Sequence, residues 1–497
     1  MSGTAPAWMI PAMSTRGGEK LDVAVIGGGP AGVIAALRSA QLGARTALIT
    51  RDGLGGMAAN DGPVPVRALA HAARLIREAK QLPTYGIGSG EASLDYPRLL
   101  DRVREVTGEV RARSLLREDL AQAGVAIYEH AGSLRFSGPH LIESAGVPAL
   151  RSETFIICTG GVSRRLAVPG FDLTATHSDA WSLSSVPDAM LVIGAGATGV
   201  QLASIFNAFG SHVTLFEAAP RILMTEDHEV AATVAAALRT SGIDVLEDAG
   251  TIERFDPGPA GVRLTHSRNG ARAHIDATMA VVAVGWIANT GALNLSAAGV
   301  QTDQRGYVQV NAQLRTTTPH IFAAGDVTGR LMVVHEAARE AYLAATNAVL
   351  GSATALPAEV SPLGSFTDPE YASVGLTETA AGESHPVIVA TQAFESLPRP
   401  IIDGRPTGFC KLIVDREHHG ILGCHIVGER AVELAQLAAV AIAAEMTVEQ
   451  LALIPFSFPT YANALGRAAI KAARALDPRA QTPLADDTYA PSSARKA

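Results

Sequence analysis

Short apolar runs alternate with longer helical stretches along most of this 497-residue chain. Residues 21–26 and 189–193 are short apolar runs of strand length, and a helical stretch follows each of them. Residues 45–49 are predicted to form a further strand after the first helix. Strands that alternate with helices predict parallel sheets covered by helices. We therefore expect an α/β fold.

The first apolar run ends in a glycine-rich turn at residues 27–32. Gly27 permits a tight turn, Gly29 lets the backbone approach a pyrophosphate, and Gly32 lets the helix pack closely on the strand. The N-terminus of the following helix offers unpaired N–H groups to phosphates. This strand–turn–helix context predicts a dinucleotide-binding domain.

The same arrangement recurs after residues 189–193, so the sequence predicts a second bound dinucleotide. Its turn carries Gly194, Gly196 and Gly199, and Glu217 closes the next strand. A carboxylate there accepts hydrogen bonds from a ribose 2′-hydroxyl and repels a 2′-phosphate, which favours NADH over NADPH. Arg221 lies nearby and could hold a phosphate instead.

A third block, residues 318–327, ends in Ala324, Gly325, Asp326 and Val327. It resembles the second FAD motif of the class I pyridine nucleotide–disulfide oxidoreductases, the family of glutathione reductase and dihydrolipoamide dehydrogenase. Residues 155–161 resemble the family's segment that crosses to the NAD domain, and the opening of its interface domain is matched by residues 366–378. The resemblance covers about residues 20–475.

This resemblance implies two doubly wound dinucleotide-binding (Rossmann-like) domains and a C-terminal α+β dimerisation domain, in a homodimer. The expected parts are a flexible N-terminus at 1–19, an FAD-binding domain at 20–165 and 291–355, an NAD-binding domain at 166–290, a dimerisation domain at 356–476 and a flexible tail at 477–497. The implied FAD contacts are Gly27, Gly29, Pro30, Ala31, Gly32, Gly56, Thr159, Gly160, Gly325, Asp326 and His335. The implied NAD contacts are Gly194, Gly196, Gly199, Glu217 and Gly285.

The stretch of this chain that resembles the family's redox loop lacks both of its cysteines. The loop reads G-G-x-C-x-x-x-x-C-x-P-S-K in the family, and here Ala58 and Pro63 take the two cysteine positions. The three cysteines of the chain, at 158, 410 and 424, are not spaced to replace that pair. Because a thiolate must attack a disulfide, we expect no disulfide reduction.

The C-terminal motif has lost its acid–base pair as well. The family's H-P-T-x-x-E, which reaches the partner's active site in the dimer, corresponds to residues 458–463. Phe458 takes the histidine position and Asn463 the glutamate position, so the proton-handling pair is absent. The two losses are consistent with each other, since the histidine serves the dithiol.

Smaller departures leave several roles open. Ala197 replaces an aromatic gate of the nicotinamide pocket, and Thr50 replaces the carboxylate that contacts the FAD adenosine ribose. The family's lysine–glutamate pair becomes Arg67 and Gln201. Arg67 is expected beside the flavin or, alternatively, on the surface. Asp61 is a candidate proton donor or substrate contact, although capping of the next helix is the commoner role.

Composition narrows the class of protein. A net charge of −8 argues against nucleic-acid binding, and no apolar run reaches the length of a membrane span. The residues 431–445 are apolar but carry Glu433, Gln436 and Glu445, which favours a core helix with Leu434, Leu437, Ala438 and Ile442 on one face. No secretory signal or metal-ligand spacing is present, and few cysteines fit a cytoplasmic protein.

The sequence therefore predicts an FAD-dependent enzyme that oxidises NADH and passes the electrons to a non-disulfide acceptor. That acceptor is either a quinone or other small aromatic oxidant, or a ferredoxin-type carrier. Arg67, Asp61 and Phe458 are the candidate catalytic residues. The alternatives are a pathway flavoenzyme with a specific organic substrate, a pyridine nucleotide transhydrogenase, and a non-catalytic FAD-bound scaffold.

Overall fold

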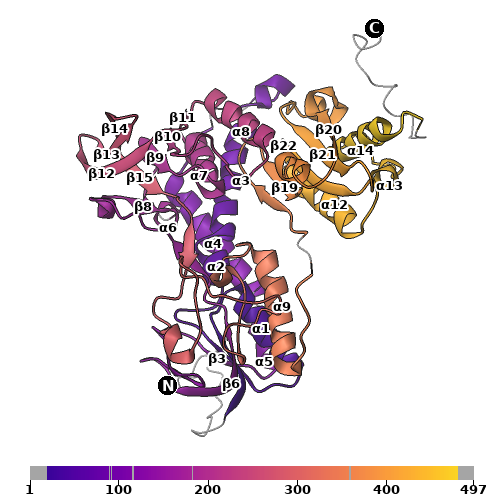
Figure 1. Ribbon diagram of the computed structural model, residues 1–497. Coiled ribbons are helices and arrows are strands. Elements are labelled where there is room, and N and C mark those ends of the chain that lie inside the picture. The colour runs from indigo at the N-terminus through magenta and orange to yellow at the C-terminus, as the bar shows by residue number, and fades with distance from the viewer. Residues whose placement is uncertain are drawn as a thin grey trace, which may run out of the picture. The chain divides into compact units, whose positions relative to one another are not determined.

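A computed structural model describes residues 20–88, 90, 92–114, 117–181, 183–357 and 360–479. The expected flexible N-terminus and nearly all of the expected C-terminal tail lie outside these ranges. The chain forms two compact units. Unit 1 draws on Met1–Gly56, Arg111–Gly161 and Ile287–Leu356, and unit 2 on Met57–Val110, Val162–Trp286 and Pro357–Ala497 (Figure 1).

Unit 1 is built on one mainly parallel sheet. Its strands in spatial order are β3 (Ala126–Tyr128), β2 (Thr46–Ile49), β1 (Leu21–Ile26), β6 (Leu150–Ile157), β5 (Leu141–Glu143) and β4 (Arg135–Gly138), and β17 (Ile321–Ala323) also pairs with β6. The pairings of β4 with β5 and of β5 with β6 are antiparallel, and the other pairings are parallel. The central strand β1 is almost wholly apolar and mostly buried, as expected for a parallel strand covered on both faces.

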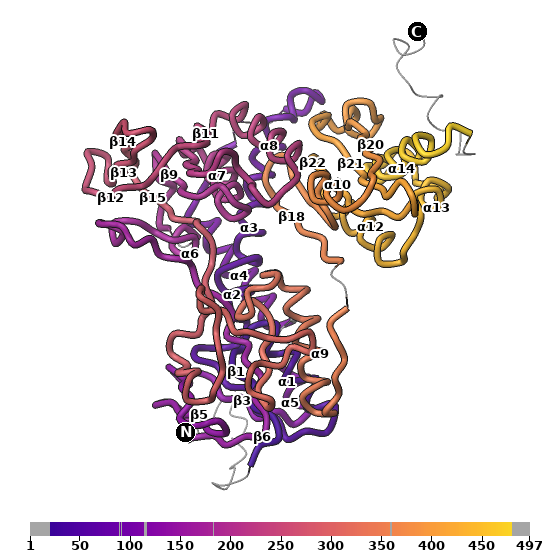
Figure 2. The backbone as a smooth tube through the Cα atoms, viewed as in Figure 1, coloured from indigo at the N-terminus to yellow at the C-terminus, as the bar shows by residue number. Residues whose placement is uncertain are grey.

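Two helices that are far apart in the sequence pack together on this sheet. They are α1 (Pro30–Gln41) and α9 (Val334–Leu350), which lie side by side in Figure 2. Their shared core consists largely of fully buried alanines, including Ala35, Ala36 and Ala341. Small side chains let the two helices approach closely. Helix α9 thus belongs to the part of the chain that returns to the first sheet. A short helix, α5 (Arg117–Gln122), also packs against α1.

Unit 2 contains a second parallel sheet with its own helices. Its strands in spatial order are β11 (Asp244–Leu246), β10 (His212–Phe216), β9 (Ala189–Ile193), β15 (Met279–Val282) and β8 (Ala175–Thr176). The accompanying helices are α3 (Pro63–Ala79), α6 (His177–Ala180), α7 (Ala197–Ala208), α8 (His228–Thr240) and α4 (Tyr96–Ser114), of which the last turn belongs to unit 1. An antiparallel meander follows in β12 (Thr251–Gly258), β13 (Gly261–Arg268) and β14 (Ala271–Ala277). One apolar cluster joins α3 and α4 to α7. Helix α3, which follows the loop that carries Ala58 and Pro63 (the altered loop), therefore belongs to this unit.

The C-terminal part of unit 2 is an antiparallel sheet with helices. Its strands in spatial order are β18 (Leu363–Ser365), β19 (Tyr371–Gly375), β22 (Ile421–Val427), β21 (Phe409–Asp415) and β20 (Val387–Ala393). Its helices are α10 (Glu378–Gly382), α11 (Pro398–Ile402), α12 (Ala431–Ala443), α13 (Val448–Ala452) and α14 (Asn463–Leu476). Strands β21 and β22 pair with each other in antiparallel fashion.

The apolar face expected on α12 is only partly correct. Leu434 and Ala438 are buried in the core, whereas Leu437 is 44% exposed. The helix is rich in alanine and nearly apolar all round, so its sequence does not mark the covered face sharply. Among the described residues, the structure offers no helix whose length and apolar character would suit a membrane span.

Candidate functional site

The first glycine turn leaves no room for side chains. Gly27 has a φ of +115°, and a Cβ at this position would overlap the carbonyl of Cys158. A Cβ on Gly32 would overlap the carbonyl of Gly27, so the tight turn and close helix packing both require glycine. Gly29 is the N-cap of α1 and makes no side-chain cap, an arrangement of helix N–H groups that suits a phosphate. Pro30 and Ala31 begin the helix.

A second glycine segment approaches this turn within unit 1. A Cβ on Gly56 would lie 2.7 Å from the Cα of Gly29, so the two backbones are nearly in contact. Thr159 lies at the end of β6, and its Oγ1 is buried without a hydrogen-bond partner among the described residues. Its neighbour Gly160 has a φ of +71°. A buried hydroxyl that no protein group satisfies fits a site that a polar ligand completes.

The turn that carries Asp326 is held by a buried glutamate that the sequence reasoning missed. Gly325 donates its N–H to Oε2 of Glu340 at 2.7 Å, and Nε of Arg330 donates to Oε1 at 3.1 Å. Glu340 is 1% exposed, and burial raises its pKa to about 7. Burial also raises the pKa of Asp326. Glu340 follows the predicted His335 by five residues, and His335 lies exposed in the first turn of α9.

The loop after β2 carries Thr50 where the family places a carboxylate, and its own hydrogen bonds hold it in place. Oγ1 of Thr50 donates to the carbonyl of Gly53, and Asp52 pairs with Arg51 at the surface. Glu129 holds the loop instead, because its Oε1 accepts the N–H of Leu54 at 3.1 Å. Nothing in the sequence pattern distinguished Glu129, since it is separated from the loop by more than sixty residues.

The second glycine turn is tied directly to Glu217. Gly194 has a φ of +94°, and Gly196 stands at the start of α7. Oε2 of Glu217 accepts the N–H of Ala195 at 2.7 Å, and Oε1 accepts the N–H of Ala219 at 2.8 Å. The carboxylate is therefore held at the turn, at the tip of β10.

Three further residues of the predicted NAD site lie near this turn or close to the sheet. A Cβ on Gly199 would overlap the carbonyl of Gly194, so helix α7 packs on its strand only with glycine there. Ala197 is exposed at the first position of α7. Gly285 has a φ of +100°, with open space where a Cβ would point.

Arg221 serves the fold of the following loop. Its guanidinium donates to four backbone carbonyls, those of Ile222, Leu223, Met224 and Glu226. A guanidinium has five N–H donors, so this arginine has little capacity left for a phosphate group. The alternative that Arg221 holds a 2′-phosphate loses its support.

The altered redox loop forms a short helix and then the start of α3. Helix α2 spans Gly56–Asn60 and contains Ala58, and α3 begins at Pro63. The residue at the N-cap is Gly62, with no side-chain cap, so the expected capping role of Asp61 is wrong. Asp61 turns to another element instead: its Oδ2 accepts the hydroxyl of Ser178 at 2.7 Å. Its Oδ1 is buried without a partner among the described residues.

The three cysteines are all buried and lie outside this loop. Cys158 is 5% exposed at the end of β6, and burial raises the pKa of its thiol. Cys410 and Cys424 face each other across β21 and β22, with 3.9 Å between their Sγ atoms, in the core of the C-terminal domain. Buried thiols of this kind are poor nucleophiles.

Arg67 and Gln201 do not pair with each other but meet at Phe366. The Arg67 guanidinium stacks on the Phe366 ring, and Oε1 of Gln201 accepts the N–H of Phe366 at 3.0 Å. Solvent reaches the Arg67 side chain, yet protein surrounds most of it, and this desolvation lowers its pKa to about 10. Arg67 therefore stays charged at neutral pH.

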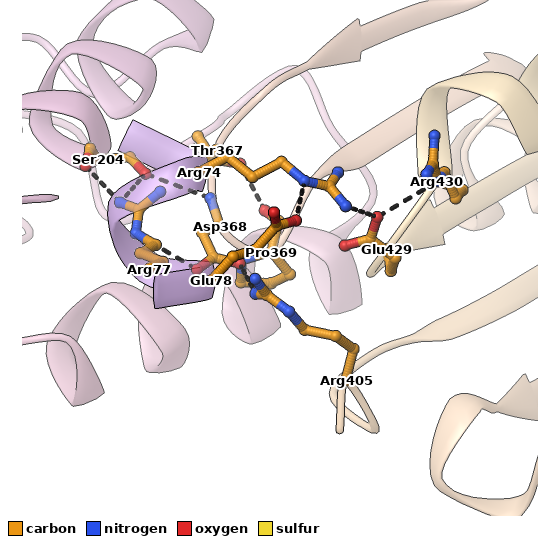
Figure 3. A network of polar contacts seen from close by, with 10 residues as sticks. All are labelled: Arg74, Arg77, Glu78, Ser204, Thr367, Asp368, Pro369, Arg405, Glu429 and Arg430. Atoms are coloured by element: carbon orange, nitrogen blue, oxygen red, sulfur yellow. Dashed lines mark hydrogen bonds and ion pairs between the residues drawn. The ribbon is translucent and has the colours of Figure 1, made fainter. Parts of the chain in front are cut away.

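Arg67 lines a cavity of about 730 Å³ inside unit 2. Its wall is an ion-pair network, and Figure 3 shows arginines of α3 reaching toward acidic residues of the C-terminal domain. Arg77 and Arg405 both pair with Asp368, and Arg74 pairs with Glu429 at 2.7 Å. The network fastens the helix that follows the altered loop to the C-terminal domain.

The residues at the family's acid–base positions do not form a pair. Phe458 is 54% exposed, and Oδ1 of Asn463 accepts from Nε of Arg467 at 3.0 Å within α14. Neither side chain takes up a proton near neutral pH. Among the described residues, no cluster of three or more His, Cys, Asp or Glu is suited to a metal ion.

Comparison with known proteins agrees with this geometry. Residues 21–341 match the family described as pyridine nucleotide-disulphide oxidoreductase, and residues 361–469 match its dimerisation domain. The chain is 33% identical over 462 residues to dihydrolipoyl dehydrogenase of Geobacillus stearothermophilus, covering 90% of this chain and 94% of that protein. It is 30% identical to mercuric reductase of Lysinibacillus sphaericus, covering 91% of this chain and 82% of the relative.

A solved structure is similar as well. The HOCl-induced flavoprotein disulfide reductase RclA from Escherichia coli, in its Cu(II) complex, matches with a TM-score of 0.81 and 26% identity. The match covers 91% of this chain and 100% of that one. The chain therefore belongs to the pyridine nucleotide-disulphide oxidoreductase family. It is an FAD-dependent oxidoreductase with NAD(P)H as co-substrate, and the expected fold class and cofactors are confirmed.

Proposed function

We propose that this protein oxidises NADH through bound FAD and passes the electrons to an acceptor that is not a disulfide. One observation carries the proposal: Ala58 and Pro63 occupy the two cysteine positions of the redox loop. Disulfide exchange requires a thiolate at the attacking position, and the cysteines of this chain are buried in other elements. Phe458 and Asn463 support the same conclusion, since neither can exchange a proton with a dithiol.

The binding residues fit the input half of this reaction. Bound FAD would supply the redox chemistry, with NADH as the hydride donor. The glycine turn at Gly27 and the free N–H groups of α1 would hold its pyrophosphate, with Thr159 and Asp326 as further polar contacts. Glu217 would hold the ribose of NADH, and its charge would oppose a 2′-phosphate.

The acceptor belongs to one of two chemical classes. A quinone or other flat aromatic oxidant suits a loop in which Ala58 and Pro63 replace polar thiols, with Phe458 as an apolar neighbour from the second chain of a homodimer. A ferredoxin-type protein would instead take electrons one at a time at the surface. A specific organic substrate, transhydrogenation and a non-catalytic scaffold are the remaining alternatives.

Anaerobic rapid mixing tests the proposal. NADH should bleach the yellow protein under nitrogen, and a panel of quinones, a ferredoxin, an oxidised NAD analogue, oxidised glutathione and lipoamide should then show which compound restores the colour. Restoration by a disulfide at a rate that supports turnover would overturn the proposal. Absence of bleaching would favour the scaffold.

Two variables separate the two acceptor classes. Reoxidation by a ferredoxin should slow as salt concentration rises, because charged proteins steer each other's encounter. Reoxidation by a quinone should be insensitive to salt and should change in Phe458→His, while reduction by NADH stays nearly the same in this variant. If neither variable affects either half-reaction, both acceptor assignments fail.

A further inference from the structure

A chain of hydrogen bonds leads away from the altered loop within unit 2. Oδ2 of Asp61 accepts the hydroxyl of Ser178 at 2.7 Å, and Oγ of Ser178 lies 3.2 Å from Nε2 of His177. On the other side of the ring, Nδ1 of His177 lies 2.8 Å from Oγ of Ser163. The four side chains come from three separate segments, so the fold brings them together.

The direction of these hydrogen bonds follows from the number of protons. The Ser178 hydroxyl has a single proton, which it donates to Asp61, so its oxygen must accept from Nε2 of His177. A neutral imidazole with its proton on Nε2 then accepts at Nδ1, where Ser163 donates. All the donors therefore point toward Asp61.

The surroundings favour the neutral imidazole that this arrangement needs. His177 is 4% exposed, and Trp286 packs edge-on against it at 4.4 Å between ring centroids. Burial lowers the pKa of His177, although Asp61 and Asp179 oppose this effect. Asp179 is occupied elsewhere, because its Oδ2 accepts the N–H and the hydroxyl of Thr176 at the start of α6. Asp61 is the carboxylate to which the Ser178 hydroxyl donates.

We propose that Ser163, His177, Ser178 and Asp61 form a proton relay that delivers a proton to an organic two-electron acceptor at the altered loop. This inference rests on the proposed function and narrows its acceptor to the quinone class. A serine stands between the histidine and the carboxylate, which differs from the hydrolytic triad, where the carboxylate orients the histidine directly. The arrangement therefore suits proton transfer rather than activation of a nucleophile.

Reduction of a quinone needs a proton that NADH does not supply, and the relay would deliver it. Conversion of a quinone to a hydroquinone takes two electrons and two protons. The hydride of NADH supplies both electrons and one proton, so one further proton must come from solvent. Ser163, which is half-buried, would receive it; His177 and Ser178 would pass it on; and Asp61 would give it to the acceptor oxygen. An iron–sulfur carrier takes electrons without protons and would need no such relay.

Reoxidation of the NADH-reduced protein by two oxidants tests the relay. Menadione requires the proton, and ferricyanide does not. Asp61→Asn should slow reoxidation by menadione about 100-fold, the range of general acid catalysis, and leave reoxidation by ferricyanide and reduction by NADH within twofold. Ser178→Ala should slow the menadione step about tenfold, and Ser178→Thr, which keeps the hydroxyl, should restore it. Asp172→Asn is the matched control, since Asp172 is exposed and pairs with surface Arg165.

A second readout does not depend on turnover. In ¹⁵N-histidine spectra at pH 7, the resonance that disappears in His177→Gln should belong to a neutral ring protonated on Nε2. A ring that is charged or protonated on Nδ1 would overturn the relay. Equal menadione rates in the wild type, Asp61→Asn and Ser178→Ala would overturn it while leaving the proposed function intact. A wild-type protein that ferredoxin reoxidises and menadione does not would also overturn it, and failure of NADH to reduce the flavin at all would defeat the proposed function itself.

Discussion

Glu217 closes the second glycine turn by accepting the N–H of Ala195 at 2.7 Å, so the strand tip and the turn form one rigid unit. The same carboxylate also accepts from Ala219. Both oxygens are therefore anchored by backbone groups, and the negative charge is fixed beside the expected ribose position. A fixed charge discriminates between ligands better than a mobile one, because it cannot move aside for a phosphate.

We predict that kcat/KM for NADH exceeds that for NADPH by at least about tenfold, equivalent to about 1.4 kcal/mol. Glu217→Gln keeps the hydrogen-bond acceptor but removes the charge, so the ratio should fall toward one. Steady-state kinetics with both nucleotides measure this. Arg221→Ala should lower stability without changing the ratio, since Arg221 holds backbone carbonyls. A ratio that is unaffected by Glu217→Gln would contradict the assignment.

Flavin retention should depend on Asp326. The purified protein should be yellow, with about one non-covalent FAD per chain. Asp326→Ala should raise the Kd for FAD about tenfold or more, the expected effect of losing a hydrogen bond made by a charged group. Fluorescence of released flavin during dialysis measures this, with Asp61→Asn as the control that retains FAD. Protein that is colourless and cannot be reconstituted would contradict the whole scheme.

No disulfide substrate should be turned over. Oxidised glutathione, lipoamide and thioredoxin should leave the NADH signal unchanged, and partial reduction should give no long-wavelength thiolate–flavin band. Ala58→Cys combined with Pro63→Cys should not create activity, because Phe458 and Asn463 cannot manage the protons. Robust disulfide reduction by the unmodified protein would contradict the interpretation that this loop has no redox-active groups.

Stability should fall with rising pH because of Glu370 in the cavity wall. Burial raises its pKa to about 7, with Glu429 contributing, while the unfolded chain titrates near 4.5. Between these values the folded protein binds more protons than the unfolded chain, so unfolding becomes easier as pH rises through this window. Glu370→Gln should remove this loss, on the order of 1–3 kcal/mol. Urea unfolding at pH 5 and pH 8 measures the difference, with exposed Glu383→Gln as the control. Equal pH dependence in both variants would refute it.

Local patterns were sufficient to predict the main architecture. The turns at Gly27 and Gly194 each follow a buried strand and open a helix, and sterics allow few alternatives there. The losses at Ala58, Pro63 and Phe458 could also be read directly, because the absence of a reactive group needs no geometry. These features depend on residues that are adjacent in the sequence.

Contacts between distant segments could not be predicted in the same way. Asp61 and Ser178 are separated by 117 positions, and capping of the nearest helix was the simpler local expectation for that aspartate. Glu340 lies close to His335 in the sequence, yet only the packing of α9 shows which of the two reaches Gly325. The meeting of Arg67 with Phe366 likewise depends on how the C-terminal domain folds onto α3.

Because all three native thiols are buried, we expect them to react slowly with maleimides in the folded protein. A single cysteine introduced at half-buried Ala58 would then be more accessible than any of the three native thiols. A fluorophore or spin label could be attached there without first removing the natural cysteines. A label at this position would report binding of an acceptor at the proposed site as a change in its fluorescence or mobility.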